Sequence, residues 1–132
     1  MAIEIDHLGI AVRSLSEGLA FYRDILGMTI THQETVASER VNVAMLPSGG
    51  ESRIELLEAT DSESTIARFI AKRGPGLHHI AIKVEDLMQT VETLRQRGAR
   101  LLNEPRAGAG GHIYVFVHPE STGGVLLELI QK

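Results

Sequence analysis

The chain has 132 residues, of which 43% are hydrophobic and 23% charged, so it is long enough to bury the core of one globular domain. Its net charge of -4 and the lack of a long lysine or arginine run disfavour nucleic acid as a partner. Because it has no cysteine, any bound metal must be held by nitrogen and oxygen. No targeting segment or membrane-length apolar run is present, so we expect a cytoplasmic protein without a membrane partner.

The first half of the chain is predicted to fold as a strand, a helix and three strands. Apolar residues alternate over residues 3–12, and they recur at three- and four-residue steps over residues 14–26. Ser14 and Glu17 form a capping-box pattern, and Gly27 is placed to end this helix. The three strands that follow are predicted at residues 28–36, 40–47 and 52–58.

The second half repeats this order after a connecting helix at about residues 62–73, which Gly74-Pro75-Gly76 ends. A strand at residues 77–84 precedes a helix at residues 86–97, which is capped by Asp86 and closed by Gly98. Three further strands are predicted at residues 100–104, 113–118 and 125–130. We therefore expect one α+β domain over residues 1–132, made of two βαβββ modules in tandem at about residues 3–58 and 77–131.

The two halves keep nearly one offset, which is the strongest signal of an internal repeat. The run DHLGIAV at residues 6–12 returns as HHIAIKV at residues 78–84, and this places His79 on His7, 72 residues later. Continuing the offset to the last strand of each module places Glu128 on Glu55, 73 residues later. Each module therefore carries a histidine on its first strand and a carboxylate on its last.

These four residues suggest one metal site. Glu55 and Glu128 each stand between two aliphatic residues, where a charged side chain is costly unless it has a partner. If the modules form curved sheets that face each other, His7, Glu55, His79 and Glu128 converge on one metal-binding cleft. Two imidazoles and two carboxylates suit a divalent Co, Ni, Mn, Fe or Zn ion and leave room for water or substrate. Taken singly, each residue could equally be a hydrogen-bonded strand residue.

The paired βαβββ modules resemble the vicinal oxygen chelate superfamily of glyoxalases, bleomycin resistance proteins and dioxygenases. Within it, three stretches are similar to the methylmalonyl-CoA epimerase family, namely ESTIARFIAKRGPGLHHIAIKV, EPRAGAGG and HPESTGGVLLEL. The resemblance covers essentially the whole chain. It implies metal ligation by His7, Glu55, His79 and Glu128, with Co²⁺ first among the candidate ions, an acyl-CoA substrate and a homodimer.

The implied reaction removes the proton between a thioester and a carboxylate and returns one on the opposite face, which needs two acid/base groups. Some members of the family carry a glutamate in the third strand of the first module, and the matching position here is Asn42, an amide that cannot act as a base. We therefore expect Glu55 and Glu128 to share ligation and proton transfer. A glyoxalase I-like lactoylglutathione lyase, an extradiol-type oxygenase and a metal-free binding protein of the same fold remain the alternatives.

Other polar residues have simpler interpretations. His78 points away from His79 on a regular strand, so a packing role is expected, and His118 before Pro119 is expected to be structural. The glycine-rich stretch at residues 108–111 lacks the features of a phosphate-binding loop and is interpreted as a mobile loop over the cleft. Four arginines could meet the phosphates of CoA or simply be solvated, namely Arg95, Arg97, Arg100 and Arg106.

Overall fold

The computed structural model describes residues 3–132, which divide into two compact units. One unit comprises residues 7–78, and the other comprises residues 79–132 together with residues 3–6. The division falls inside strand β1 (Glu4–Ala11), directly before His7, and inside strand β5 (Gly76–Lys83), directly before His79. The two histidines singled out by the sequence repeat therefore stand at equivalent points of the chain.

The sheet of the first unit has the strand order β2-β3-β4-β1. Its antiparallel strands β2 (His32–Val36), β3 (Val41–Pro47) and β4 (Arg53–Ala59) follow one another along the chain. Strand β1 pairs in parallel with β4, and Gly9 lies opposite Glu55. This parallel pair brings the first strand of the module beside its last.

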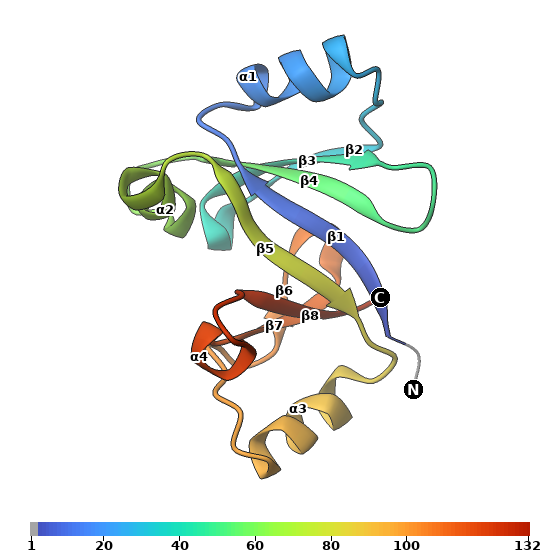
Figure 1. The fold of residues 1–132 in the computed structure, drawn as a ribbon, viewed down its shortest axis with the longest axis vertical. Helices are drawn as coiled ribbons and strands as arrows, with labels where there is room; N and C mark the ends of the chain where they lie inside the picture. The colour runs from blue at the N-terminus through green and yellow to red at the C-terminus, as the bar shows by residue number, and fades with distance from the viewer. Residues whose placement is uncertain (1–2) are drawn as a thin grey trace. The chain divides into compact units, whose positions relative to one another are not determined.

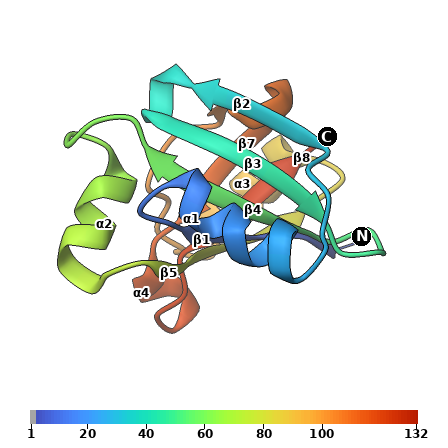
Figure 2. The same cartoon turned by 90° about the horizontal axis from the view of Figure 1, so that it is seen from above.

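A helix covers one face of this sheet (Figures 1 and 2). It begins as α1 (Leu15–Leu19), where the Ser14 hydroxyl accepts a hydrogen bond from the Glu17 N–H, and it continues as a π-helical segment, η1 (Ala20–Ile25). Leu15 and Leu19 pack with Ala44, Leu46 and Leu56 of the sheet. The helix forms because its apolar residues recur on one side, and burial of that side against β3 and β4 holds it in place.

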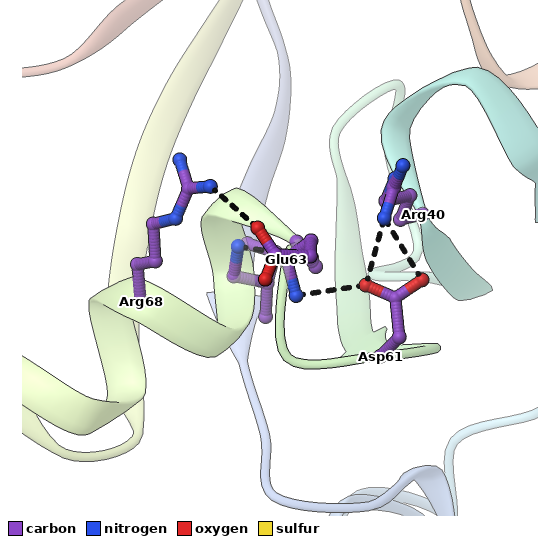
Figure 3. Close-up of polar contacts among 6 residues, drawn as sticks. Arg40, Asp61, Glu63 and Arg68 are labelled. Carbon is purple, nitrogen blue, oxygen red and sulfur yellow. Dashed lines mark hydrogen bonds and ion pairs between the residues drawn. The ribbon is translucent and has the colours of Figure 1, made fainter.

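Helix α2 (Thr65–Arg73) packs on the opposite face through Ile66, Phe69 and Ile70. The Ser64 hydroxyl caps it by accepting the Ile66 N–H at 3.1 Å. The approach to α2 is tied to the short 3-10 turn η2 (Ala37–Glu39) by Arg40, whose guanidinium lies 3.3 Å from a carboxylate oxygen of Asp61 (Figure 3).

The second unit repeats the arrangement with the strand order β5-β8-β7-β6. Strand β5 pairs in parallel with β8 (Leu127–Gln131), with Ala81 opposite Glu128. Helix α3 (Leu87–Gln96) packs through Leu87 and Val91 on β7 (Ile113–Val117) and β8. The remaining elements are β6 (Arg106–Ala107), the 3-10 turn η3 (Ala109–Gly111) and α4 (Pro119–Thr122).

The α+β class and the repeated βαβββ order are confirmed, but two predicted elements differ. Residues 28–31 are not part of β2, because the Met28 N–H donates to the Tyr22 carbonyl and so belongs to the end of the preceding helix. Residues 100–104 form only an isolated bridge at Leu101, and the strand that follows α3 in the second module is instead the short β6. Within residues 3–132, no helix is long and apolar enough to cross a membrane.

Helix α4 was missed by the sequence analysis. His118 caps it through Nδ1, which accepts the Glu120 N–H, Pro119 occupies the first turn, and Gly123 ends it in a left-handed conformation with a φ of 78°. This is the standard order of a capping residue, an early proline and a terminal glycine. The signal was present, but the segment is only one turn long and reads as a turn.

Candidate active site

The first unit brings His7 and Glu55 together on one face of its sheet. His7 Nε2 lies 3.4 Å from a carboxylate oxygen of Glu55, and the two residues are 2% and 5% exposed. Side chains alternate along a strand, so Glu55 shares its face with Leu57, whereas Ile54 and Leu56 turn toward α1. The pair therefore lies on the face opposite α1.

The second unit contains the same pair in His79 and Glu128. His79 Nε2 lies 3.0 Å from a carboxylate oxygen of Glu128, and the two residues are 4% and 8% exposed. Phe116 of β7 lies opposite Glu128 across the sheet, and its ring meets the His79 imidazole edge-on at a centroid distance of 5.6 Å. The aromatic contact restricts the orientation of the imidazole.

Each pair suits the coordination of a divalent metal ion. Two ligand atoms about 2.1 Å from one ion are separated by about 3.0 Å at a right angle and about 3.4 Å at a tetrahedral angle. The His79–Glu128 and His7–Glu55 separations of 3.0 and 3.4 Å agree with these values. Both histidines also offer the same nitrogen, Nε2, to the carboxylate. Each half of the repeat therefore supplies one imidazole and one carboxylate in a geometry that a metal can bridge.

Asn42 is not beside this pair, so the expectation that it stands at the position of the family's third-strand glutamate is wrong. In the β3–β4 pairing Asn42 lies opposite Glu58, whereas Met45 lies opposite Glu55. The Asn42 amide donates to the Glu58 carboxylate at 2.9 Å and accepts from the Thr35 hydroxyl at 2.6 Å. Because opposite residues of a sheet share a face, Asn42 belongs to the α1 side.

Val43, which follows Asn42 on β3, packs with Leu57 and Val41 on the same face of the sheet as Glu55. The β3 residues on the pair's own face are therefore apolar, and they offer no acid or base. Among His7, Glu55 and the β3 residues on their face, the groups able to move a proton are His7 and Glu55.

The expected structural roles of two other histidines are confirmed. The His78 ring stacks edge-on against Phe69 of α2 at 4.9 Å, and His118 is the cap of α4 described above. Arg95 and Arg100 each lie beside a carboxylate, at 2.6 Å from Glu104 and 3.5 Å from Glu120. The charge of these two arginines is therefore already partly offset within the chain.

The glycine-rich stretch lies against an aromatic side chain. A Cβ at Gly108 would stand 2.7 Å from Cε1 of Tyr114, and the Tyr114 ring in turn meets Phe116 edge-on at 5.6 Å. The Gly108 N–H donates to the His112 carbonyl, and the Gly111 N–H donates to the Gly108 carbonyl. The stretch is thus closed by its own backbone bonds and is joined, ring by ring, to the His79 imidazole.

Two polar residues near the pairs were missed in the sequence analysis, Glu58 and Gln131. The Leu15 N–H donates to Glu58 at 2.9 Å, and the Leu87 N–H donates to Gln131 at 2.7 Å. Glu58 and Gln131 stand three residues after Glu55 and Glu128, at the same offset of 73. Extending the repeat by three residues would have found them.

The repeat, the paired strands and the His–Glu pairs define the class. The chain belongs to the Glyoxalase/Bleomycin resistance protein/Dioxygenase superfamily, whose family model matches residues 6–116. Within that superfamily it is similar to methylmalonyl-CoA epimerases, as the sequence motifs indicated. The ethylmalonyl-CoA/methylmalonyl-CoA epimerase of Cereibacter sphaeroides is 35% identical over 130 residues, which cover 96% of each chain.

Solved structures of methylmalonyl-CoA epimerases are also similar to this chain. The methylmalonyl-CoA epimerase of Mycobacterium tuberculosis is 39% identical with a TM-score of 0.91, over 96% of this chain and 86% of that one. A variant of the Streptomyces coelicolor methylmalonyl-CoA epimerase in complex with 2-nitronate-propionyl-CoA is 38% identical with a TM-score of 0.92, over 97% and 96%. A probable lactoylglutathione lyase of Synechocystis is 33% identical, over 95% and 92% of the two chains.

Proposed function

We propose that this chain interconverts (R)- and (S)-methylmalonyl-CoA at one divalent metal site held by His7, Glu55, His79 and Glu128. The observation that carries the proposal is the buried His–Glu pair that recurs in both units at the same position of the repeat. His79 and Glu128 of one unit and His7 of the other are residue types that can hold a metal ion. Relatives named as epimerases, similar over almost the whole chain, support the choice of substrate.

The reaction needs a proton removed beside a thioester and returned on the other face. A divalent ion at the site would supply a Lewis acid for the oxygen that gains charge. One of Glu55 and Glu128 takes the proton from the carbon, and the electron pair left behind is delocalised into the thioester carbonyl. The other carboxyl group then donates a proton to the opposite face, which inverts the centre. The β3 residues on the same face as Glu55, Val43 and Met45, are apolar and supply no further base in the first unit.

The residues also suit other details of the proposal. Imidazole and carboxylate ligands with no thiolate suit a divalent Co²⁺, Ni²⁺, Mn²⁺, Zn²⁺ or Fe²⁺ ion. We place Co²⁺ first among them because of the resemblance to methylmalonyl-CoA epimerases. We further propose that residues 1–132 act as one domain, that the protein works in the cytoplasm as a homodimer, and that its small-molecule partner is an acyl-CoA.

The lactoylglutathione lyase is the second candidate, because such an enzyme is among the relatives and the proton chemistry is similar. Protein purified without chelator is assayed with methylmalonyl-CoA and with the methylglyoxal–glutathione adduct, and its metal content is measured. We expect bound divalent metal and turnover of the CoA ester only. Turnover of the glutathione adduct alone would favour the lyase, and an inert metal-free protein would favour a binding function.

Deuterium uptake tests the roles of the two glutamates. In D₂O, metal-loaded Glu55→Gln and Glu128→Gln are each expected to lose epimerisation but still to exchange the proton of one epimer, a different epimer for each variant. Glu51→Gln, which changes an exposed turn residue, serves as the control and should behave like the unaltered chain. Undiminished exchange of both epimers by both variants would rule out proton transfer by Glu55 and Glu128.

A further inference from the structure

The first unit ties the start of its helix to the end of its last strand. The Leu15 N–H, the first of α1, donates to Glu58 Oε2 at 2.9 Å, and Glu58 stands at the end of β4. Leu15 is buried at 9% exposure, so water is poorly placed to satisfy this N–H. The Ser14 cap satisfies a different N–H, that of Glu17. The Glu58 carboxylate therefore satisfies an N–H at the helix start that the capping residue leaves unpaired.

The second unit makes the same contact with a neutral side chain. The Leu87 N–H, the first of α3, donates to Gln131 Oε1 at 2.7 Å, and Leu87 is fully buried. The Asp86 cap again serves another N–H, that of Gln89. Two copies of one contact, made by different residue types, indicate that the geometry matters more than the charge.

Each contact completes a closed loop of chain segments and hydrogen bonds, and this loop includes one His–Glu pair. In the first unit, β1 carries His7 and leads directly into α1, while β4 carries Glu55 and ends with Glu58. The equivalent loop in the second unit runs from His79 on β5 to Leu87 at the start of α3, and from there to Gln131 and Glu128 on β8. Fixing the helix start on the strand end therefore fixes how far one strand can slide along the other.

Sliding is the motion that would separate the ligands. A shift of two residues leaves both side chains on the same face but displaces one by about 6.6 Å along the strand relative to the other. The alternation of faces therefore does not prevent such a shift. The parallel pairing extends over five residue pairs in the first unit and four in the second. A bond from the strand end to the helix that follows the partner strand opposes such a shift.

The first unit extends its contact further. The other Glu58 oxygen accepts from the Asn42 amide, whose own oxygen accepts from Thr35 of β2, so α1, β4, β3 and β2 are joined in sequence. In the second unit the residue opposite Gln131 is Ile113, which cannot continue such a chain. Glu58 therefore connects more elements of its unit than Gln131 connects in the second unit.

We propose that Glu58 and Gln131 are positioning residues for the metal ligands, each setting from the opposite face of the sheet the offset at which histidine meets glutamate. Glu58 acts on His7 and Glu55, and Gln131 acts on His79 and Glu128. The proposal rests on the proposed metal function for its purpose, but its geometric claim concerns each unit alone.

The test uses the full chain without metal and follows the imidazole resonances of His7 and His79 by NMR. Glu58→Met keeps the side-chain length but removes the acceptor, and we expect it to move the His7 resonances while those of His79 stay in place. Gln131→Met should do the reverse. Amide exchange of Leu15 should rise roughly tenfold in Glu58→Met, as expected for loss of a hydrogen bond to a charged acceptor. Glu58→Gln restores an acceptor and should return both readouts toward those of the unaltered chain.

Glu17→Met is the matched control, because Glu17 is an exposed carboxylate in the same first turn. It should change neither set of resonances. A Glu58→Met protein whose two histidines both keep their resonances, or both move equally, would overturn the proposal. Should Glu58→Met not fold, Gln131→Met and Asn42→Ala are judged by the same rule, Asn42→Ala being expected to move His7 alone.

Cobalt titration connects the geometry to function. Glu58→Met is expected to bind Co²⁺ roughly tenfold more weakly and Glu58→Gln nearly as well as the unaltered chain. Unchanged Co²⁺ affinity in Glu58→Met would contradict the positioning role. If the unaltered chain itself binds no Co²⁺, the metal function fails, while the selective imidazole shifts still decide the geometric claim.

Discussion

Gly108 is the residue whose lack of a side chain is most clearly required. Replacing it with alanine would place a Cβ 2.7 Å from the Tyr114 ring, and Tyr114 is only 5% exposed. We expect Gly108→Ala to lower the free energy of unfolding by about 1–3 kcal/mol, the usual cost of overpacking. Urea denaturation measures it. The control is Gly50→Ala, where no atom lies within 4 Å of the new Cβ; equal effects of the two substitutions would contradict the close packing.

Glu104 offers a pH-dependent prediction. Hydrogen bonds from the Arg95 guanidinium, together with its charge, hold the pKa of Glu104 below its ordinary value. A carboxyl whose pKa is lowered by folding adds stability above the ordinary value of 4.5, and this is lost as the pH falls through the folded pKa. Arg95→Gln should therefore raise the pKa of Glu104, as measured by carboxyl carbon NMR. Arg97→Gln is the control, and a Glu104 pKa unaffected by Arg95→Gln would refute the pairing.

Single residues also show how far the sequence could lead. The four residues of the His7–Glu55 and His79–Glu128 pairs were found because the repeat marks them twice, and the members of each pair lie close together within their own unit. Asn42 was misassigned because sequence order does not reveal which face a strand residue occupies. Its face follows from the β3–β4 pairing, a contact between residues 16 positions apart in the chain.

Among the elements, the helices were predicted best where a cap marks the start. Ser14, Ser64 and Asp86 each accept a backbone N–H at the beginning of a helix, and these bonds depend on residues two or three positions away. The pairing of the short β6 depends on β7, a strand further along the chain. Local patterns could not predict this strand, because its stability comes from pairing with another strand.

Ser64 allows a test of one cap. It is 1% exposed, and its hydroxyl accepts the Ile66 N–H at 3.1 Å, so alanine would leave that donor without its partner. We expect Ser64→Ala to cost roughly 1–2 kcal/mol of unfolding free energy. Denaturation of Ser64→Ala is compared with that of Ser62→Ala, an exposed serine just before it. A cost no larger than that of Ser62→Ala would show that the cap contributes little.

At the scale of the whole molecule, the sequence predicted the tandem modules because a duplicated chain carries its own internal alignment. The strand order within each unit, with the first strand beside the last, could not be predicted from the sequence. It requires the parallel pairing of β1 with β4 and of β5 with β8, which no local pattern encodes. The repeat nevertheless determined that whatever topology one unit adopts, the other adopts too.

Metal binding would therefore act on the molecule as a whole, because the proposed ligands come equally from both units. An ion bound only by the folded chain raises the free energy of unfolding by about 2.7 kcal/mol at a concentration one hundred times its Kd. We expect Co²⁺ to raise the Tm of the unaltered chain, and His7→Ala and His79→Ala, one in each unit, to lose most of that rise. His32→Ala, which removes an exposed histidine paired with Glu34, should keep it. A Tm rise that survives in either His7→Ala or His79→Ala would mean that the ion does not join ligands from both units.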